Sequence, residues 1–183
     1  MSEMKLSKEK TYDLLDKISE DNEEYGLVFK LCYVYGRLIS EIYSLDNADV
    51  DFDEDKITFT INNVRVDYPL HSSVKIDLKR QVNETSNYLF QHIAVGLDNF
   101  ASRLNYYLKK WDSYCGVHIT PRDFKRLRGQ HLVLDGVPIG LVQELFRGRN
   151  ISSTKRFIGY EDLLDIKDVD SLEDIFCDYT MGG

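Results

Sequence analysis

A group of cationic side chains in the last third of the chain could bind phosphates. Residues 116–158 hold 8 basic and 3 acidic side chains. Arg122, Lys125 and Arg126 recur at a spacing that brings them onto one face of a helix. Further cations follow on segments expected to be close by: Arg147, Arg149, Lys155 and Arg156. Each cation that neutralises a phosphate adds to a salt-dependent affinity, so one hypothesis is a DNA- or RNA-binding regulator.

A second candidate for chemistry is the segment Val74-Lys75-Ile76-Asp77-Leu78-Lys79. Its alternation of apolar and polar residues predicts a strand that carries an Asp-x-Lys pattern, and Asp67 falls on the preceding predicted strand. Between about Glu23 and Trp111 the order of elements resembles the core of restriction-endonuclease-type nucleases. The resemblance implies that Asp67 and Asp77 would bind Mg²⁺ and that Lys79 would orient the attacking water. A Mg²⁺-dependent nuclease is therefore another hypothesis, and it alone would need a cofactor.

The same residues also have a structural explanation. If residues 74–79 pair with the preceding strand, Arg65 faces Asp77 and Asp67 faces Lys75. Opposite charges at such cross-strand positions stabilise an antiparallel sheet without any catalysis. The sequence leaves both interpretations open.

The two ends of the chain are acidic, and their charge leads to the main expectation. Residues 1–55 hold 15 acidic and 6 basic side chains, and the whole chain has a net charge of −8. Acidic segments can occupy a basic groove that normally holds nucleic acid. We therefore expect an acidic inhibitor or modulator of a nucleic-acid-processing enzyme, of the anti-defence type that phages and mobile elements encode. The expected partner-binding residues are Asp49, Asp51, Asp53, Asp55, Asp168, Asp170, Glu173 and Asp174.

Other classes of protein find little support. The acidic loop that begins at Asp49 lacks the glycine and the glutamate of a calcium loop, so no metal site is predicted. No phosphate-binding glycine loop, dinucleotide fingerprint or serine-hydrolase motif occurs. The sequence has no long uncharged apolar stretch, and its three cysteines are far apart. These features favour a cytoplasmic protein. We expect it to be a monomer or a homodimer, and its acidic ends suggest a nucleic-acid-binding enzyme or a ribonucleoprotein as its partner.

Apolar spacing predicts the elements of the first two thirds. Helices are expected at 7–19, with Ser7 as the N-cap, at 23–45 and at 83–111. Asn62-Asn63 predicts a two-residue hairpin turn that pairs Ile61 with Val64 and Ile57 with Tyr68. Residues 74–79 would add the third strand.

The last third is expected to mix helix and strand. Thr120-Pro121 predicts the start of a short helix that ends at Gly129. Asp135-Gly136 predicts a second hairpin, and two short acidic helices would follow it. The expected fold class is α+β: a three-stranded antiparallel sheet packed by two long helices in a core domain of residues 1–115, and a small α/β module at 116–183.

Overall fold

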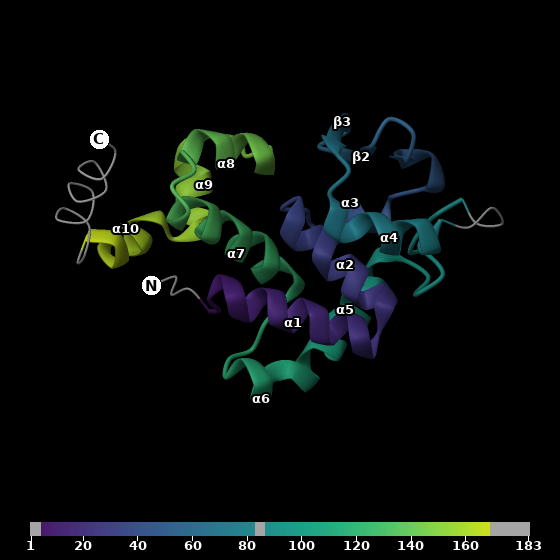
Figure 1. Ribbon diagram of the computed structural model, residues 1–183, viewed down its shortest axis with the longest axis horizontal. Helices are drawn as coiled ribbons and strands as arrows, with labels where there is room; N and C mark the ends of the chain where they lie inside the picture. Colours follow the sequence, from purple (N-terminus) through teal and green to yellow (C-terminus); the bar gives the residue numbers. More distant parts are fainter. Residues whose placement is uncertain (1–4, 83–86, 169–183) are drawn as a thin grey trace, which may run out of the picture. The chain divides into compact units, whose positions relative to one another are not determined.

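The computed structural model describes residues 5–82 and 87–168, and these form two compact units (Figure 1). The first unit comprises the described residues up to Arg128, and the second begins at Gly129. The boundary between units thus falls inside a helix, later than the predicted boundary at residue 115. That residues 1–115 and 116–183 are separate domains stays a prediction.

Helices α1 (Lys8–Asp21) and α2 (Glu23–Val34) pack against each other in the first unit. The hydroxyl of Ser7 accepts a hydrogen bond from the Lys10 amide at 3.2 Å, which confirms the predicted cap. Asn22 caps α2 by accepting from the amide of Tyr25 at 2.9 Å. Gly26 allows the two helices to approach closely, because a Cβ there would collide with Ser19.

The single helix predicted at 23–45 is wrong, since α2 ends at Val34 and α3 (Ile39–Tyr43) begins after a break. Gly36 lies in the break with a φ of +61°, a left-handed conformation that glycine adopts without steric cost. The change of direction buries the side chain of Arg37, which is 0 % exposed.

The sheet is antiparallel with the order β1-β2-β3. Its strands, after the short helix η1 (Asn47–Asp49), are β1 (Val50–Asp51), β2 (Lys56–Ile61) and β3 (Val64–Pro69). The predicted hairpin is confirmed, since Ile61 pairs with Val64 and Ile57 with Tyr68. Asn62 and Asn63 both have positive φ values, 50° and 63°, as a two-residue hairpin turn requires.

The predicted third strand at 74–79 is wrong, because these residues belong to helix α4 (Ser72–Gln81). Val74 and Leu78, four residues apart, are buried on one helical face, whereas Ile76 is 64 % exposed. Burial therefore follows the period of a helix and not the alternation of a strand, which would also have buried Ile76. The expected pairs of Arg65 with Asp77 and of Asp67 with Lys75 do not form, and Arg65 instead contacts Asp49 at 2.7 Å.

The long helix predicted at 83–111 is also wrong. Helix α5 (Leu97–Leu108) begins only after Gly96, whose φ is +85°, and it is followed by η2 (Lys109–Trp111) and α6 (Asp112–Cys115). Phe100, Leu104 and Leu108 form its buried face. The two long helices of the predicted architecture are therefore not confirmed.

Helices make up the remainder of the described chain. These are α7 (Pro121–Leu134), α8 (Ile139–Phe146), α9 (Ile151–Ile158) and α10 (Tyr160–Asp168). The helix start at Pro121 is confirmed, but α7 continues through Gly129. Asp135-Gly136 joins two helices, so the predicted hairpin is wrong, and the described residues 116–168 contain helices and no strand.

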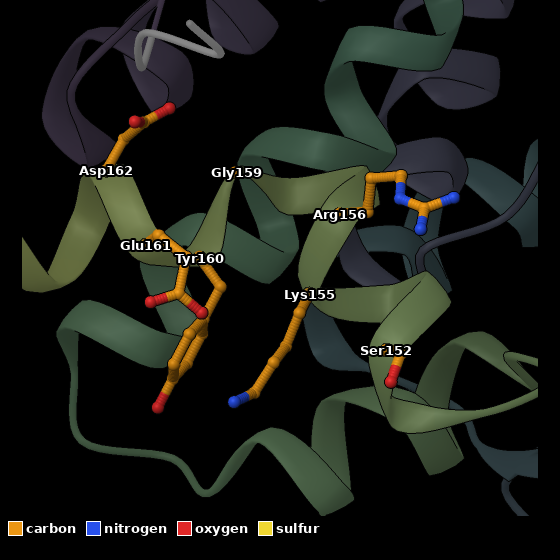
Figure 2. Close-up of a pocket in the computed structure, with 7 residues that line it drawn as sticks. All are labelled: Ser152, Lys155, Arg156, Gly159, Tyr160, Glu161 and Asp162. Carbon is orange, nitrogen blue, oxygen red and sulfur yellow. The ribbon is translucent and has the colours of Figure 1, made fainter.

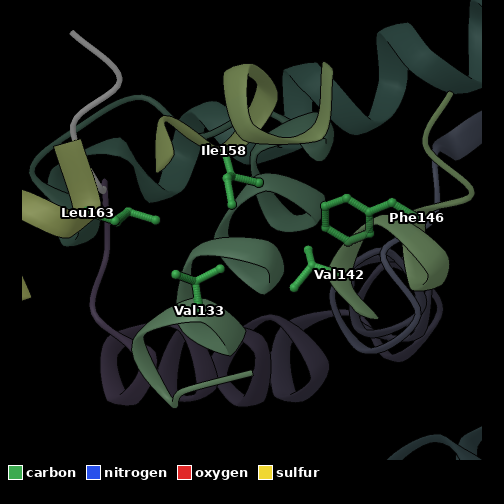
Figure 3. Close-up of a cluster of buried hydrophobic side chains, with 5 residues drawn as sticks. All are labelled: Val133, Val142, Phe146, Ile158 and Leu163. Atoms are coloured by element: carbon green, nitrogen blue, oxygen red, sulfur yellow. The ribbon is translucent and has the colours of Figure 1, made fainter. Parts of the chain in front are cut away.

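A small apolar core holds the second unit together (Figure 3). It consists of Val133, Val142, Phe146, Ile158 and Leu163. Gly129 lies where α7 approaches this core, because a Cβ there would be 2.6 Å from the Ile158 side chain and 3.0 Å from the Phe146 ring. Close packing thus explains why a glycine occurs within this helix rather than at its end.

The fold is a mostly helical α+β fold with a small antiparallel sheet. Among the residues that the structure describes, no helix is long and apolar enough to cross a membrane.

Candidate nucleic-acid interface

The start of α7 is fixed by Asp123. Its carboxylate accepts hydrogen bonds from the amide and the hydroxyl of Thr120, at 2.9 and 2.7 Å, and from the ammonium of Lys5 at 2.9 Å. Burial alone would raise the pKa of Asp123, but these hydrogen bonds outweigh it and hold the pKa below its usual range. The first two turns of α7, which carry Arg122, Lys125 and Arg126, are thereby anchored within the first unit.

Arg37 is a buried cation of the same unit. Its Nε donates a hydrogen bond to the carbonyl of Tyr35 at 2.9 Å, and its Nη1 lies 3.8 Å from a carboxylate oxygen of Glu41. The guanidinium also lies over the ring of Tyr68, 5.3 Å from the centroid. Glu41 is fixed in turn, since its other contact is a 2.8 Å hydrogen bond from the amide of Leu38. The side chain of Arg37 therefore has a single well-defined position.

Lys125 is the second buried cation, with only 9 % of its surface exposed. Burial lowers the pKa of Lys125 to about 8. The value of about 8 also includes a raising effect of Glu41 and lowering effects of the positive charges of Arg37 and Arg122. These interactions place Lys125 in one electrostatic group with Arg37, Glu41 and Arg122, which we name the Arg37 cluster.

The Arg37 cluster holds two cationic side chains away from solvent. Arg37 and Lys125 are both buried, and Glu41 and the exposed Arg122 act on the charge of Lys125. Keeping cations out of water is costly, and an anion that binds beside them offsets part of that cost. Arginine and lysine together are well suited to bind a phosphate. The planar guanidinium donates two parallel hydrogen bonds to the phosphate oxygens, and the ammonium supplies a compact positive charge. The arrangement therefore fits an anion-binding site for a phosphate group.

The other predicted phosphate-binding residues have more varied positions. Arg126 contacts Asp123 at 3.4 Å, so its charge is partly compensated. In the second unit, Arg147 and Arg149 are exposed around the end of α8. Lys155 and Arg156, on the last turn of α9, line a pocket of about 550 Å³ with Tyr160 (Figure 2). The ammonium of Lys155 lies 4.5 Å from the centre of the Tyr160 ring, and Figure 2 shows Arg156 pointing away from both.

The residues of the hypothetical nuclease site are engaged elsewhere. Asp67 on β3 accepts a 2.8 Å hydrogen bond from Thr58, and Asp77 on α4 forms an ion pair with Lys30 at 3.1 Å. Lys79 lies over the ring of Phe52, 5.5 Å from its centre. Within residues 5–82 and 87–168, no three His, Cys, Asp or Glu side chains are grouped so that they could hold a metal ion. Because the strand on which this hypothesis depended is a helix, the nuclease architecture is wrong.

The acidic residues near position 50 mostly stabilise local structure. Asp49 is buried, contacts Arg65 and accepts from the amide of Asp46 at 3.0 Å. Asp51 accepts from the amides of Asp53 and Glu54, and Asp55 pairs with Lys75. Of the remaining acidic candidates, Asp168 ends α10, whereas Asp170, Glu173 and Asp174 lie outside the described residues.

Sequence reasoning missed Arg37 and Glu41 as parts of a cationic site. The helix predicted at residues 23–45 assigned no role to Arg37. The available signal was Gly36-Arg37 within an otherwise apolar segment, since glycine breaks helices and arginine is rarely buried without a partner or a role.

The family of the chain follows from comparison of its sequence with known proteins. The profile of the phage integrase family matches residues 5–162, so the chain belongs to the phage integrase family. Tyrosine recombinase XerA of Thermococcus kodakarensis is 27 % identical over 157 residues, and its counterpart from Thermococcus onnurineus is 25 % identical over the same length. In both cases the match covers 82 % of this chain and 56 % of the relative. The chain thus spans about half the length of the curated relatives it matches.

Solved structures share the fold. The crystal structure of XerA recombinase superimposes with a TM-score of 0.67 at 16 % identity, covering 84 % of this chain and 57 % of that one. The structure of XerH recombinase bound to its palindromic difH substrate has a TM-score of 0.70 at 13 % identity, and the match covers 92 % of this chain and 53 % of that one. The structure of the Tn1549 transposon integrase in complex with transposon right end DNA has a TM-score of 0.64 at 16 % identity. This match covers 83 % of this chain and 60 % of that one.

Membership of this family overturns the main expectation from sequence. The expected acidic inhibitor that imitates nucleic acid is wrong, and so is the expected anti-defence role. The expectation failed because it depended on net charge, which concerns solubility and association rather than fold. The alternative hypothesis, direct binding of nucleic acid, agrees better with the family.

Proposed function

We propose that this chain binds duplex DNA through the Arg37 cluster and acts in site-specific DNA recombination. The observation that carries the proposal is the pair of buried cations Arg37 and Lys125 near Glu41, with the exposed Arg122 beside them. Two further findings support it. The chain belongs to the phage integrase family, and similar structures include recombinases bound to DNA.

One phosphate of the DNA backbone is the ligand that best matches the cluster. Its negative charge would offset the cost of holding two cations away from water. Arg122, which is exposed, would reach the same phosphate or its neighbour from the solvent side. A fixed guanidinium and a fixed helix start would orient the backbone without reading its sequence.

Exposed cations of the second unit would strengthen the attachment. Arg147, Arg149 and Arg156 are exposed, and each phosphate that they neutralise would release counterions and add salt dependence. The proposal concerns DNA binding by this chain together with a part in recombination. A protein partner, which the inhibitor hypothesis required, is not needed for it.

Substitution of Arg122 by alanine tests the proposal directly. We expect the affinity for a fluorescent duplex of about 30 base pairs to fall about tenfold at low salt, because one charge-assisted contact is lost. The slope of log affinity against log salt should decrease by about one. Fluorescence anisotropy at several salt concentrations measures both quantities.

Lys79→Ala is the matched control, since it removes one exposed positive charge from α4. It should leave the duplex affinity within about twofold of the unsubstituted chain and the salt slope unchanged. Equal losses for Arg122→Ala and Lys79→Ala would show that only the overall charge matters, and would refute binding at the Arg37 cluster.

A further inference from the structure

A second surface of the first unit combines aromatic rings with cations. Arg103, Tyr106 and Lys109 recur at every third residue along α5 and η2, so they follow one face of the helix. This face borders a pocket of about 540 Å³, a volume typical of small-molecule sites. The pocket is lined by Tyr25, Arg103, Tyr106, Tyr107, Lys109 and Lys110.

One side of the pocket is held by fixed contacts. The rings of Tyr25 and Tyr107 meet edge to face with centroids 4.7 Å apart. The hydroxyl of Tyr107 donates to Asp21 at 2.6 Å, and Lys110 pairs with the same carboxylate while lying 4.3 Å from the Tyr107 ring centre. The hydrogen bonds from Lys110 and Tyr107 lower the pKa of Asp21, so its charge balances that of Lys110. This side of the pocket is therefore preorganised.

The other side is open and presents a ring between two cations. Tyr106 is 77 % exposed, and Arg103 and Lys109 beside it are also exposed. The core of the unit does not use this ring, since α5 buries Phe100, Leu104 and Leu108 instead. An exposed aromatic face flanked by cations is the arrangement on which nucleobases stack while their phosphates are neutralised.

We propose that this pocket binds an unpaired nucleotide of a single-stranded nucleic acid, with the base stacked on Tyr106 and the backbone phosphates against Arg103 and Lys109. A duplex presents phosphates but hides the faces of its bases, so it would not use the ring. An acidic peptide would satisfy the two cations and likewise leave the ring unused. The site shares no residue with the Arg37 cluster and extends the proposed function to unpaired strands.

The test is binding of a fluorescent oligothymidine of about ten nucleotides, measured by anisotropy. Tyr106→Ala should weaken this binding at least about fivefold, because base stacking on an aromatic side chain is lost. Tyr106→Phe keeps the ring and should bind like the unsubstituted chain. Arg103→Ala should weaken binding and reduce its salt dependence by about one charge. Since Tyr106 is exposed, both variants are expected to fold, and circular dichroism verifies this.

Two comparisons decide whether base stacking is involved and whether this site is separate. An abasic strand of equal length should bind more weakly than oligothymidine, and Tyr106→Ala should leave duplex affinity unchanged. Binding of the abasic strand at equal strength, an unaltered affinity in Tyr106→Ala, or no binding of oligothymidine would each overturn the proposal. A loss of duplex binding in Arg122→Ala alone bears on the Arg37 cluster, so the two proposals can fail independently.

Discussion

Lys125→Met is expected to raise the stability of the folded chain and to weaken its binding to DNA. The pKa of Lys125 lies at about 8 instead of 10.5, so the folded structure disfavours the charged ammonium. A difference of that size corresponds to about 3 kcal/mol at pH 7, where folded and unfolded states are both charged. Methionine has a similar length without the charge, so we expect a gain of up to about 3 kcal/mol in the free energy of unfolding, measured with urea.

The pH dependence of stability provides a second test of the cost of burying Lys125. As pH rises from about 8 towards 10.5, the folded chain releases the Lys125 proton before the unfolded chain does. The unfolded state then binds more protons, so the unsubstituted chain should gain stability over this window. The advantage of Lys125→Met should shrink over the same window. A Lys125→Met chain that is less stable at pH 7 would show instead that the attraction between Lys125 and Glu41 outweighs the cost of burial.

DNA binding should respond to pH through the same residue. Phosphate binding requires charged Lys125, and only about one tenth of it carries a proton at pH 9 in the free chain. Duplex affinity should therefore fall up to about tenfold more between pH 7 and pH 9 than it does in Lys125→Arg, whose guanidinium stays charged. Equal pH dependence of the two chains would exclude Lys125 from the phosphate contact.

Gly129→Ala is expected to destabilise the second unit by about 1 to 3 kcal/mol. The added methyl group would lie 2.6 Å from Ile158 and 3.0 Å from the Phe146 ring, so the core must shift to accept it. Alanine favours the helix by up to about 1 kcal/mol, but the steric cost is larger. Thermal unfolding followed by circular dichroism measures the difference.

Gly140→Ala provides the matched control in helix α8. Nothing lies within 4 Å of a Cβ at that position, so the substitution should stabilise the chain by about 0.5 to 1 kcal/mol through helix propensity alone. If both alanine variants are stabilised, α7 does not approach Ile158 as closely as the structure indicates.

The sequence predicted those elements whose signals are local. The hairpin between Ile57 and Tyr68 was predicted with its register, because Asn62 and Asn63 suit the turn and one face of each strand is apolar. The Ser7 cap of α1 and the start of α7 at Pro121 followed from short motifs in the same way. Such signals depend on neighbouring residues, so they do not require the tertiary structure.

Predictions failed where tertiary packing decides between two local possibilities. Residues 74–79 satisfy a strand pattern, yet they form a helix, because a helix buries both Val74 and Leu78 in the interior of the first unit. Asp135-Gly136 can close a hairpin, but here it follows α7, and Val133 and Val142 on either side belong to one helical core. Arg37 and Lys125 are far apart in the sequence, so residue spacing could not reveal that their charges act on one another.

Equilibrium binding of the unsubstituted chain to duplex DNA over a range of salt concentrations tests the central claim most directly. We predict binding with a dissociation constant of about 10⁻⁴ to 10⁻⁶ M near physiological salt, and an affinity that increases steeply as salt is lowered. The chain should bind despite its net charge of −8, since the Arg37 cluster concentrates positive charge locally. A folded chain that does not bind duplex DNA even at low salt would contradict the account.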